Sequence, residues 1–295
     1  MRKWSAVCWT LSLLGVFSAC TTPGVPSNTA SSPALQAAPA TAAAAVPADE
    51  AEMVYIPAGE FTMGDDGPYD YDTRPARRMS LPAFWIDTGE VTNTRYKHFI
   101  DATGHKVPWS PDPAVQPYAW DWQSRMYPSG KANDPAVLVS WEDARAFCTW
   151  AGKTLPSEAQ WEKAARGLKG NLYPWGNTWL PGKANTRESG RGGTVASGAF
   201  EGDVSEFGVR DLGGNVSEWV EEWFAPYPGN PLISYEARDT YKVLRGGSWD
   251  YRNSIANGYH RQYALPQSQM PAIGFRCVKA ADEPAGGAPP PARPR

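Results

Sequence analysis

Histidine and cysteine are scarce in this 295-residue sequence, which has three histidines and four cysteines. The three histidines are too widely separated to form a cluster with the ligand spacing of a zinc site. A nucleophile elbow, a phosphate-binding glycine loop and a zinc-protease helix motif are also missing. These absences exclude the sequence signatures of several large enzyme classes.

Positive charge is neither in excess nor clustered. The 28 Lys and Arg residues are balanced by 31 Asp and Glu residues, and the net charge is −3. No basic stripe is present that would follow a phosphate backbone. We therefore expect no nucleic-acid partner.

The N-terminal apolar run, residues 4–17, is too short to span a bilayer about 30 Å thick. It follows two basic residues and is typical of a signal peptide, which we assign to residues 1–19. Small residues then precede Cys20, as in a lipobox, so we expect Cys20 to carry a lipid anchor; ordinary cleavage nearby is the alternative. Because Thr21 is not Asp, we expect an exported, periplasmic protein held at the outer membrane.

The segments flanking the folded domain are rich in small and polar residues. Residues 20–52 consist mainly of Ala, Pro, Ser and Thr, a composition that cannot bury enough apolar area to offset its ordering entropy. We interpret residues 20–52 as a disordered, lipid-anchored linker and residues 280–295 as a disordered tail. Through this linker and its lipid anchor, we expect the membrane to be a partner of the protein.

Residues 53–279 are expected to form one compact, loop-rich domain, since the chain has 14 Trp, 13 Tyr, 28 Gly and 28 Pro. Strand-like runs at 53–56 and 61–63 predict a hairpin. Helices are predicted from Thr92 or Asn93 to Gly104, from the capping pattern at 140–143 to Gly152, and from the capping box at 157–160 to Gly167. Cys148 falls on the apolar face of the second helix.

An ordered set of short motifs runs through the domain. The motifs are Ile56–Gly64 (IPAGEFTMG), Val139–Glu162 (VSWEDA, FCTWAGK and LPSEAQWE), Pro174–Asn177 (PWGN), Gly213–Trp219 (GGNVSEW), Arg245–Trp249 (RGGSW) and Ile273–Cys277 (IGFRC). Together they resemble the sulfatase-modifying factor family, which includes the formylglycine-generating enzyme. The resemblance covers about residues 53–279 and implies a single α+β domain with little regular structure, related to C-type lectins and often stabilised by calcium.

The cysteines of the domain indicate whether it can carry out the family's copper-dependent oxidase reaction. Family members with cysteines at both positions join them, so the resemblance implies a disulfide between Cys148 and Cys277. The family's copper-binding cysteines lie three and eight residues after the Ser of Gly-Gly-Ser, where this chain has Tyr251 and Ala256. Cu(I) selects soft thiolate ligands. We therefore expect neither copper as a cofactor nor the standard oxidase reaction.

Six residues are candidates for a surviving groove. Trp219 and Ser248 match family groove positions, and four others lie on the same returning segment: Tyr251, Tyr259, His260 and Arg261. Each also has a structural interpretation. A lone histidine is more often a hydrogen-bonded structural group than a catalyst, and Tyr251 is either a stacking platform or a groove-filling core residue.

A family calcium site is implied at the turn before residue 219. Its ligands here would be the side chains of Asn215 and Glu218 with carbonyls near Gly213 and Val216, and oxygen ligands suit this hard cation. The alternative is that Asn215 only forms a turn and Glu218 only an ion pair. A second family site has no matching carboxylate at 190–193, which puts that site in doubt.

We interpret the chain as a cell-envelope lipoprotein whose domain is a non-oxidase binding or regulatory module, with an envelope protein or a small ligand as its partner. Two alternatives stay open. One is a periplasmic tailoring enzyme with non-cysteine chemistry, as in the family member that matures the pyoverdine chromophore. The other is a variable ligand-display protein of the lectin fold.

Overall fold

The computed structural model describes residues 51–68, 70–230 and 239–281, all within one compact unit. The predicted signal peptide, Cys20 and nearly all of the predicted linker lie outside the described residues, as does the predicted tail from residue 282. No helix in the described ranges is long and apolar enough to cross a membrane.

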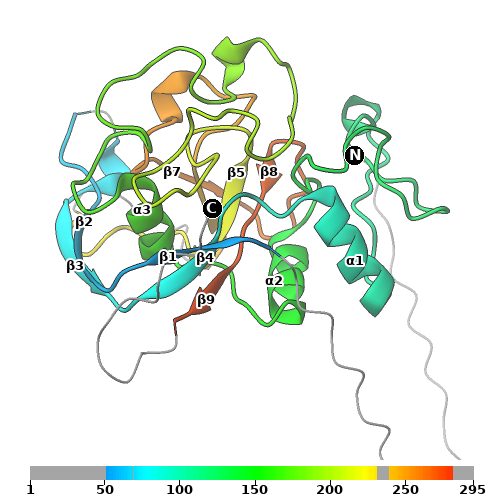
Figure 1. The fold of residues 1–295 in the computed structure, drawn as a ribbon, viewed down its shortest axis with the longest axis horizontal. Coiled ribbons are helices and arrows are strands. Elements are labelled where there is room, and N and C mark those ends of the chain that lie inside the picture. The colour runs from blue at the N-terminus through cyan, green and yellow to red at the C-terminus, as the bar shows by residue number, and fades with distance from the viewer. Residues whose placement is uncertain (1–50, 69, 231–238, 282–295) are drawn as a thin grey trace, which may run out of the picture. The chain divides into compact units, whose positions relative to one another are not determined.

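The described residues form three small sheets and three α-helices (Figure 1). The helices are α1 (Asn93–Thr103), α2 (Trp141–Trp150) and α3 (Glu158–Arg166). The strands are β1 (Met53–Ile56), β2 (Gly59–Met63), β3 (Arg77–Leu81), β4 (Phe84–Asp87), β5 (Ser217–Trp223), β6 (Lys242–Arg245), β7 (Arg261–Ala264), β8 (Ile273–Gly274) and β9 (Val278–Ala280). This is the expected α+β domain, in which long loops carry much of the chain.

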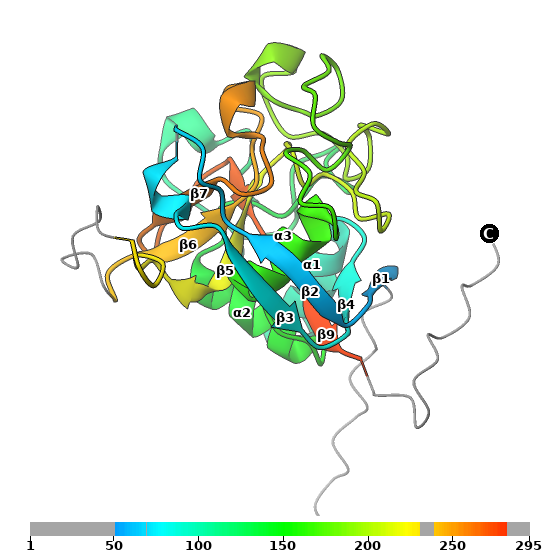
Figure 2. The ribbon, with the colours of Figure 1, turned by 90° about the vertical axis from the view of Figure 1, so that its left-hand side faces the viewer.

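The sheets have the orders β1-β4-β9, β2-β3 and β7-β6-β5-β8. All neighbouring strands are antiparallel except β5 and β8, which run parallel. Helix α3 contacts both the β2-β3 pair and strands β5 and β6 (Figure 2). It therefore joins the N-terminal part of the domain to the larger sheet.

The predicted hairpin at residues 53–63 is wrong. Strand β1 pairs with β4, and β2 pairs with β3, so the two runs are neighbours in sequence but not in a sheet. The chain between β1 and β2 is bound by the buried Lys163 of α3. The Nζ of Lys163 donates to the carbonyl oxygens of Pro57 at 2.6 Å and Gly59 at 3.0 Å. The turn is held by a helix that lies a hundred residues later, a contact that local turn chemistry does not contain.

All three predicted helices are present, each with its predicted N-cap; α2 ends at Trp150 with Ala151 as its C-cap, just before the predicted Gly152. The Thr92 hydroxyl accepts from the amide of Arg95, and Gly104 ends α1 with a φ of 74°. Capping boxes begin α2 at Ser140 and α3 at Ser157. These signals act over one turn, so the sequence is sufficient to predict them.

Candidate functional site

A single loop between β6 and β7, residues 246–260, carries most of the predicted groove residues. Its first residues are tightly packed. A Cβ at Gly247 would lie 2.5 Å from the carbonyl oxygen of Gly213, so only glycine fits there. This contact fixes the start of the loop against the 213–219 turn.

Ser248 is fully buried, and its Oγ has no hydrogen-bond partner among the described residues. A buried hydroxyl without a partner is rare in folded proteins, since its desolvation is not compensated. The position therefore has unused capacity to hydrogen-bond a water or a ligand atom.

Trp219 does not line an open surface. It is fully buried in the main apolar cluster, and its Nε1 donates to the carbonyl oxygen of Val139 at 3.1 Å. The structure therefore makes Trp219 a core residue that supports the loop from below.

We define an aromatic platform as Tyr118, Trp249 and Tyr251, of which Trp249 and Tyr251 belong to this loop. The rings of Tyr118 and Trp249 are stacked, with centroids 5.9 Å apart and planes 14° apart. Trp249 is anchored by Nε1, which donates to the carbonyl oxygen of Pro271 at 3.1 Å. Tyr251 is 40% exposed, which favours the stacking interpretation of this residue over the core interpretation.

Ala256 lies at the other position where the family resemblance places a copper ligand, and it is fully buried. Its methyl group has no donor atom. The short 3-10 turn Asn253–Ile255 separates it from Tyr251. The two positions thus differ both in chemistry and in exposure, and neither supplies a thiolate.

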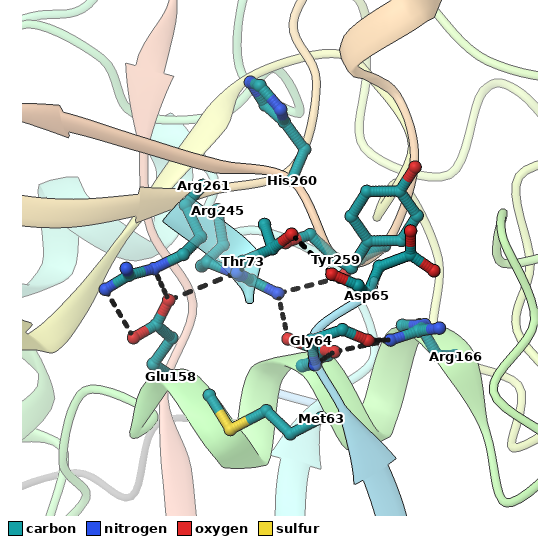
Figure 3. Close-up of polar contacts among 12 residues, drawn as sticks. Met63, Gly64, Asp65, Thr73, Glu158, Arg166, Arg245, Tyr259, His260 and Arg261 are labelled. Carbon is teal, nitrogen blue, oxygen red and sulfur yellow. Dashed lines mark hydrogen bonds and ion pairs between the residues drawn. The ribbon is translucent and has the colours of Figure 1, made fainter. Parts of the chain in front are cut away.

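Arg261 belongs to a buried ionic network (Figure 3). Its Nε lies 2.6 Å from Glu158 Oε1, and Arg245 Nη1 lies 3.2 Å from the same oxygen. A second carboxylate, Glu162, pairs with Arg245 at 2.6 Å and with Arg166 at 2.7 Å. Burial opposes ionisation of Glu158, but Arg261 and Arg245 outweigh it and lower the pKa of the carboxyl. The network is structural, because it joins α3 to β6 and β7.

Tyr259 and His260 lie at the edge of this network. Burial, with Asp65 and Asp70 nearby, raises the pKa of Tyr259 to about 12. His260 Nδ1 lies 2.9 Å from Asp70 Oδ2, which ties the loop to the segment after β2. Figure 3 shows His260 pointing away from the Glu158 pair. This agrees with the structural interpretation of a lone histidine.

The predicted calcium ligands are hydrogen-bonded within the protein. Each carboxylate oxygen of Glu218 accepts a hydrogen bond from the Arg276 guanidinium at 2.7 Å, and Oε2 also accepts one from Trp161 Nε1 at 2.8 Å. Asn215 Oδ1 accepts from the Asn185 side chain and the Val195 amide, both at 3.1 Å. In the described ranges no three His, Cys, Asp or Glu side chains converge as metal ligands.

The surroundings of Glu218 are nevertheless suited to a hard cation. Three further carboxylates that sequence reasoning missed are buried nearby, namely Glu90, Asp203 and Asp211. Burial and the repulsion of Asp211 raise the pKa of both Glu90 and Asp203 well above the usual range. A divalent cation would relieve this repulsion with oxygen ligands of the right kind. Oxygen atoms are the right class of ligand, but Arg276 occupies both oxygens of Glu218, and the calcium site stays a prediction.

A cavity of about 400 Å³ borders Glu90, one member of this carboxylate group. It is lined by Glu90, Arg95, Ser197 and Arg210, among others. The Ser197 Oγ lies 2.5 Å from Glu90 Oε2 and 3.0 Å from Asp211 Oδ2, so it bridges the two carboxyl groups. Of the buried carboxylates, Glu90 is the one that borders the cavity.

The two cysteines of the domain form the expected bond. Cys148 on α2 and Cys277 before β9 are joined, with Cα atoms 5.6 Å apart and both side chains fully buried. The bond closes a segment of 129 residues. No free thiol remains in the described part of the chain.

Comparison with known proteins gives consistent matches over nearly the whole domain. The model of the sulfatase-modifying factor enzyme 1-like domain matches residues 39–281. The formylglycine-generating enzyme of Streptomyces coelicolor is 36% identical, covering 85% of this chain and 98% of that protein. The inactive Cα-formylglycine-generating enzyme 2 of Mus musculus is 34% identical, covering 80% of this chain and 88% of that protein.

Among solved structures, PvdO from Pseudomonas aeruginosa superposes with a TM-score of 0.65 at 28% identity. The match covers 79% of this chain and 95% of PvdO.

Proposed function

Because the chain belongs to the sulfatase-modifying factor enzyme 1-like family, we propose that it is a cell-envelope lipoprotein in which this domain is a binding or regulatory module. It does not act as a formylglycine-forming oxidase in this proposal. The observation that carries the proposal is the pair Tyr251 and Ala256, together with the Cys148–Cys277 bond.

Copper binding in this loop would require sulfur ligands. Cu(I) is held by soft thiolate or thioether ligands, whereas a phenol oxygen is hard and a methyl group is no ligand. A relative whose name marks it as inactive, at 34% identity, supports the view that the domain persists without this activity.

The aromatic platform supports a binding role. Aromatic rings bury large areas at low entropic cost, and they are frequent anchors at interfaces. Beside the platform, the exposed Arg187 lies 3.4 Å from Asp250 Oδ1, which gives the same face a charged rim. An aromatic centre with a charged rim suits an envelope protein or a small polar ligand as partner.

One experiment tests the rejection of oxidase chemistry. The purified protein is incubated with copper, oxygen and a Cys-x-Pro-x-Arg peptide, and aldehyde formation is followed by mass spectrometry. We expect no aldehyde and no stoichiometric Cu(I) binding. The double variant Tyr251→Cys/Ala256→Cys is the matched control, in which we expect Cu(I) binding to appear. Aldehyde formation by the unaltered protein would contradict the proposal.

A second experiment tests the binding surface. A photoreactive amino acid is placed at position 251, and a second protein carries it at the exposed Glu221 as a control. We expect crosslinks in cells from position 251 alone, and we expect Trp249→Ala to abolish them because the stacked platform is lost. Equal crosslinking from both positions would remove the platform from the proposal.

The lipid anchor is tested separately. Labelled palmitate should enter the wild-type protein and not Cys20→Ser, and the wild-type protein should fractionate with the outer membrane. Labelling that is unchanged in Cys20→Ser would contradict lipidation at this residue.

A tailoring enzyme with non-cysteine chemistry is the second candidate function, and the unpartnered Ser248 hydroxyl favours it. That buried oxygen lies at the start of the same loop as Tyr251, where a reacting group could be hydrogen-bonded. Incubation with envelope extract separates the two functions. A chemically altered compound formed by the wild type and not by Ser248→Ala would indicate an enzyme, whereas a retained, unaltered compound would indicate a binding module.

A further inference from the structure

A hairpin that carries exposed apolar side chains projects from the segment between α1 and α2. The Asp121 amide donates to the carbonyl oxygen of Met126 at 2.9 Å, which closes the turn. Trp122 within the turn is 62% exposed and Met126 is 45% exposed. Trp109, 43% exposed, is held alongside, since the Trp120 amide donates to the carbonyl oxygen of Pro108 at 2.8 Å. We call Trp109, Trp122 and Met126 the tryptophan hairpin.

The exposure of these side chains is imposed by an ordered backbone. Asp121 Oδ1 accepts from the amide and the hydroxyl of Ser124, at 2.6 and 2.7 Å. Arg125 adopts a left-handed φ of 57°, and its Nη2 donates at 3.0 Å to the carbonyl oxygens of Ile100 and His105 at the end of α1. Such a conformation is uncommon for arginine and persists only where the surroundings enforce it. The fold therefore presents the hairpin in one defined orientation.

The first described residues of the chain and the tryptophan hairpin are packed at opposite ends of helix α1. The Glu52 carbonyl oxygen accepts from the Thr88 amide at 2.9 Å, and Ala51 and Glu52 line the same cavity as Thr92 and Arg95 in the first turn of α1. The hairpin is bound to the last turn of that helix, which is roughly 16 Å long. Figure 1 shows the connection after α1 projecting from the body beside the helix.

We propose that the tryptophan hairpin inserts into the interfacial region of the phospholipid bilayer to which the chain is anchored. The inference rests on the proposed lipid anchor at Cys20. A random-coil chain of about 30 residues has a root-mean-square reach of roughly 30 Å, so a linker of the predicted length would hold the domain close to the bilayer. Tryptophan favours the membrane interface, where its ring is buried and its N–H stays hydrated. Insertion would orient the domain on the membrane.

The charges at the hairpin agree with a zwitterionic bilayer. The Arg125 guanidinium and the Asp121 carboxylate both form hydrogen bonds inside the protein, and these bonds would stay intact on insertion. Apolar contact supplies the affinity, and we expect insertion to depend weakly on salt.

The test uses the acylated mature protein in phosphatidylcholine vesicles. Gln123→Cys supplies the reactive thiol for an environment-sensitive fluorophore, because Cys20 is acylated and Cys148 and Cys277 are joined. Ser254→Cys, which is exposed on the loop before β7, is the matched control. We expect a blue-shifted emission and quenching by spin-labelled lipid at position 123 and neither effect at position 254.

Further variants separate insertion from anchoring. Trp122→Ser should abolish the blue shift at position 123 while acylation and melting temperature are unchanged. The mature chain with Cys20→Ser should still bind vesicles weakly, and Trp122→Ser should weaken that binding about tenfold or more, from the apolar area it removes. An acylated protein with no response at position 123, or an equal response at 254, would overturn the proposal and leave this face to a protein partner. Absence of acylation would instead contradict the proposed function.

Discussion

Removal of the Cys148–Cys277 bond gives the sharpest test of the reasoning about sulfur. The double variant Cys148→Ala/Cys277→Ala opens a loop of 129 residues. Loop-closure entropy for this length corresponds to about 5 kcal/mol at 25 °C, before any strain in the native state is subtracted. For a domain of this size, 1 kcal/mol shifts the melting temperature by about 2–4 °C. We therefore expect a decrease of about 10–20 °C, measured by calorimetry or circular dichroism.

The single variants supply the control. Each one alone breaks the bond, so Cys148→Ala and Cys277→Ala should each be destabilised nearly as much as the double variant. Both sulfur atoms are fully buried, so a reductant should act slowly on the folded wild type and rapidly once it is unfolded. If the single effects add up to the double effect, or if the melting temperature falls by less than about 3 °C, the bond does not constrain the unfolded chain as argued.

Three further predictions concern ionisable groups. Burial and the nearby Glu158 raise the pKa of Glu222 from 4.5 to about 7. The folded state therefore holds a proton that the unfolded state releases. Up to about 3 kcal/mol of stability present below pH 4.5 is lost as the pH rises to 7, and Glu222→Gln should be the more stable protein at pH 8 in urea unfolding but not at pH 4. Glu158→Ala should lower the free energy of unfolding in urea by about 3–5 kcal/mol, because Arg261 and Arg245 would be left buried without their shared carboxylate. A decrease of less than about 1 kcal/mol would contradict the importance of this network. Calcium at a hundred times its dissociation constant should stabilise the wild type by about 2.7 kcal/mol and Glu90→Gln much less; a wild type indifferent to chelator would remove the metal site.

The sequence by itself determined the features that depend on neighbours in the chain. The caps of α1, α2 and α3 need only residues within one turn, so their helices were predictable. The motifs identified the family because their order is a property of the chain, and with the family came the fold and the cysteine pair. The loss of copper ligands at Tyr251 and Ala256 also follows from residue identity alone.

Only the tertiary structure decided which polar groups meet. Glu218 is paired with Arg276, 58 residues away, and Arg261 with Glu158, 103 residues away. The hairpin predicted from 53–63 failed for the same reason, since Lys163 holds that turn from a distant helix. Burial also separated Trp219 from Tyr251, although both were candidates for the same groove. Ionic pairing and exposure depend on contacts between segments distant in the sequence, and local patterns carry no information about them.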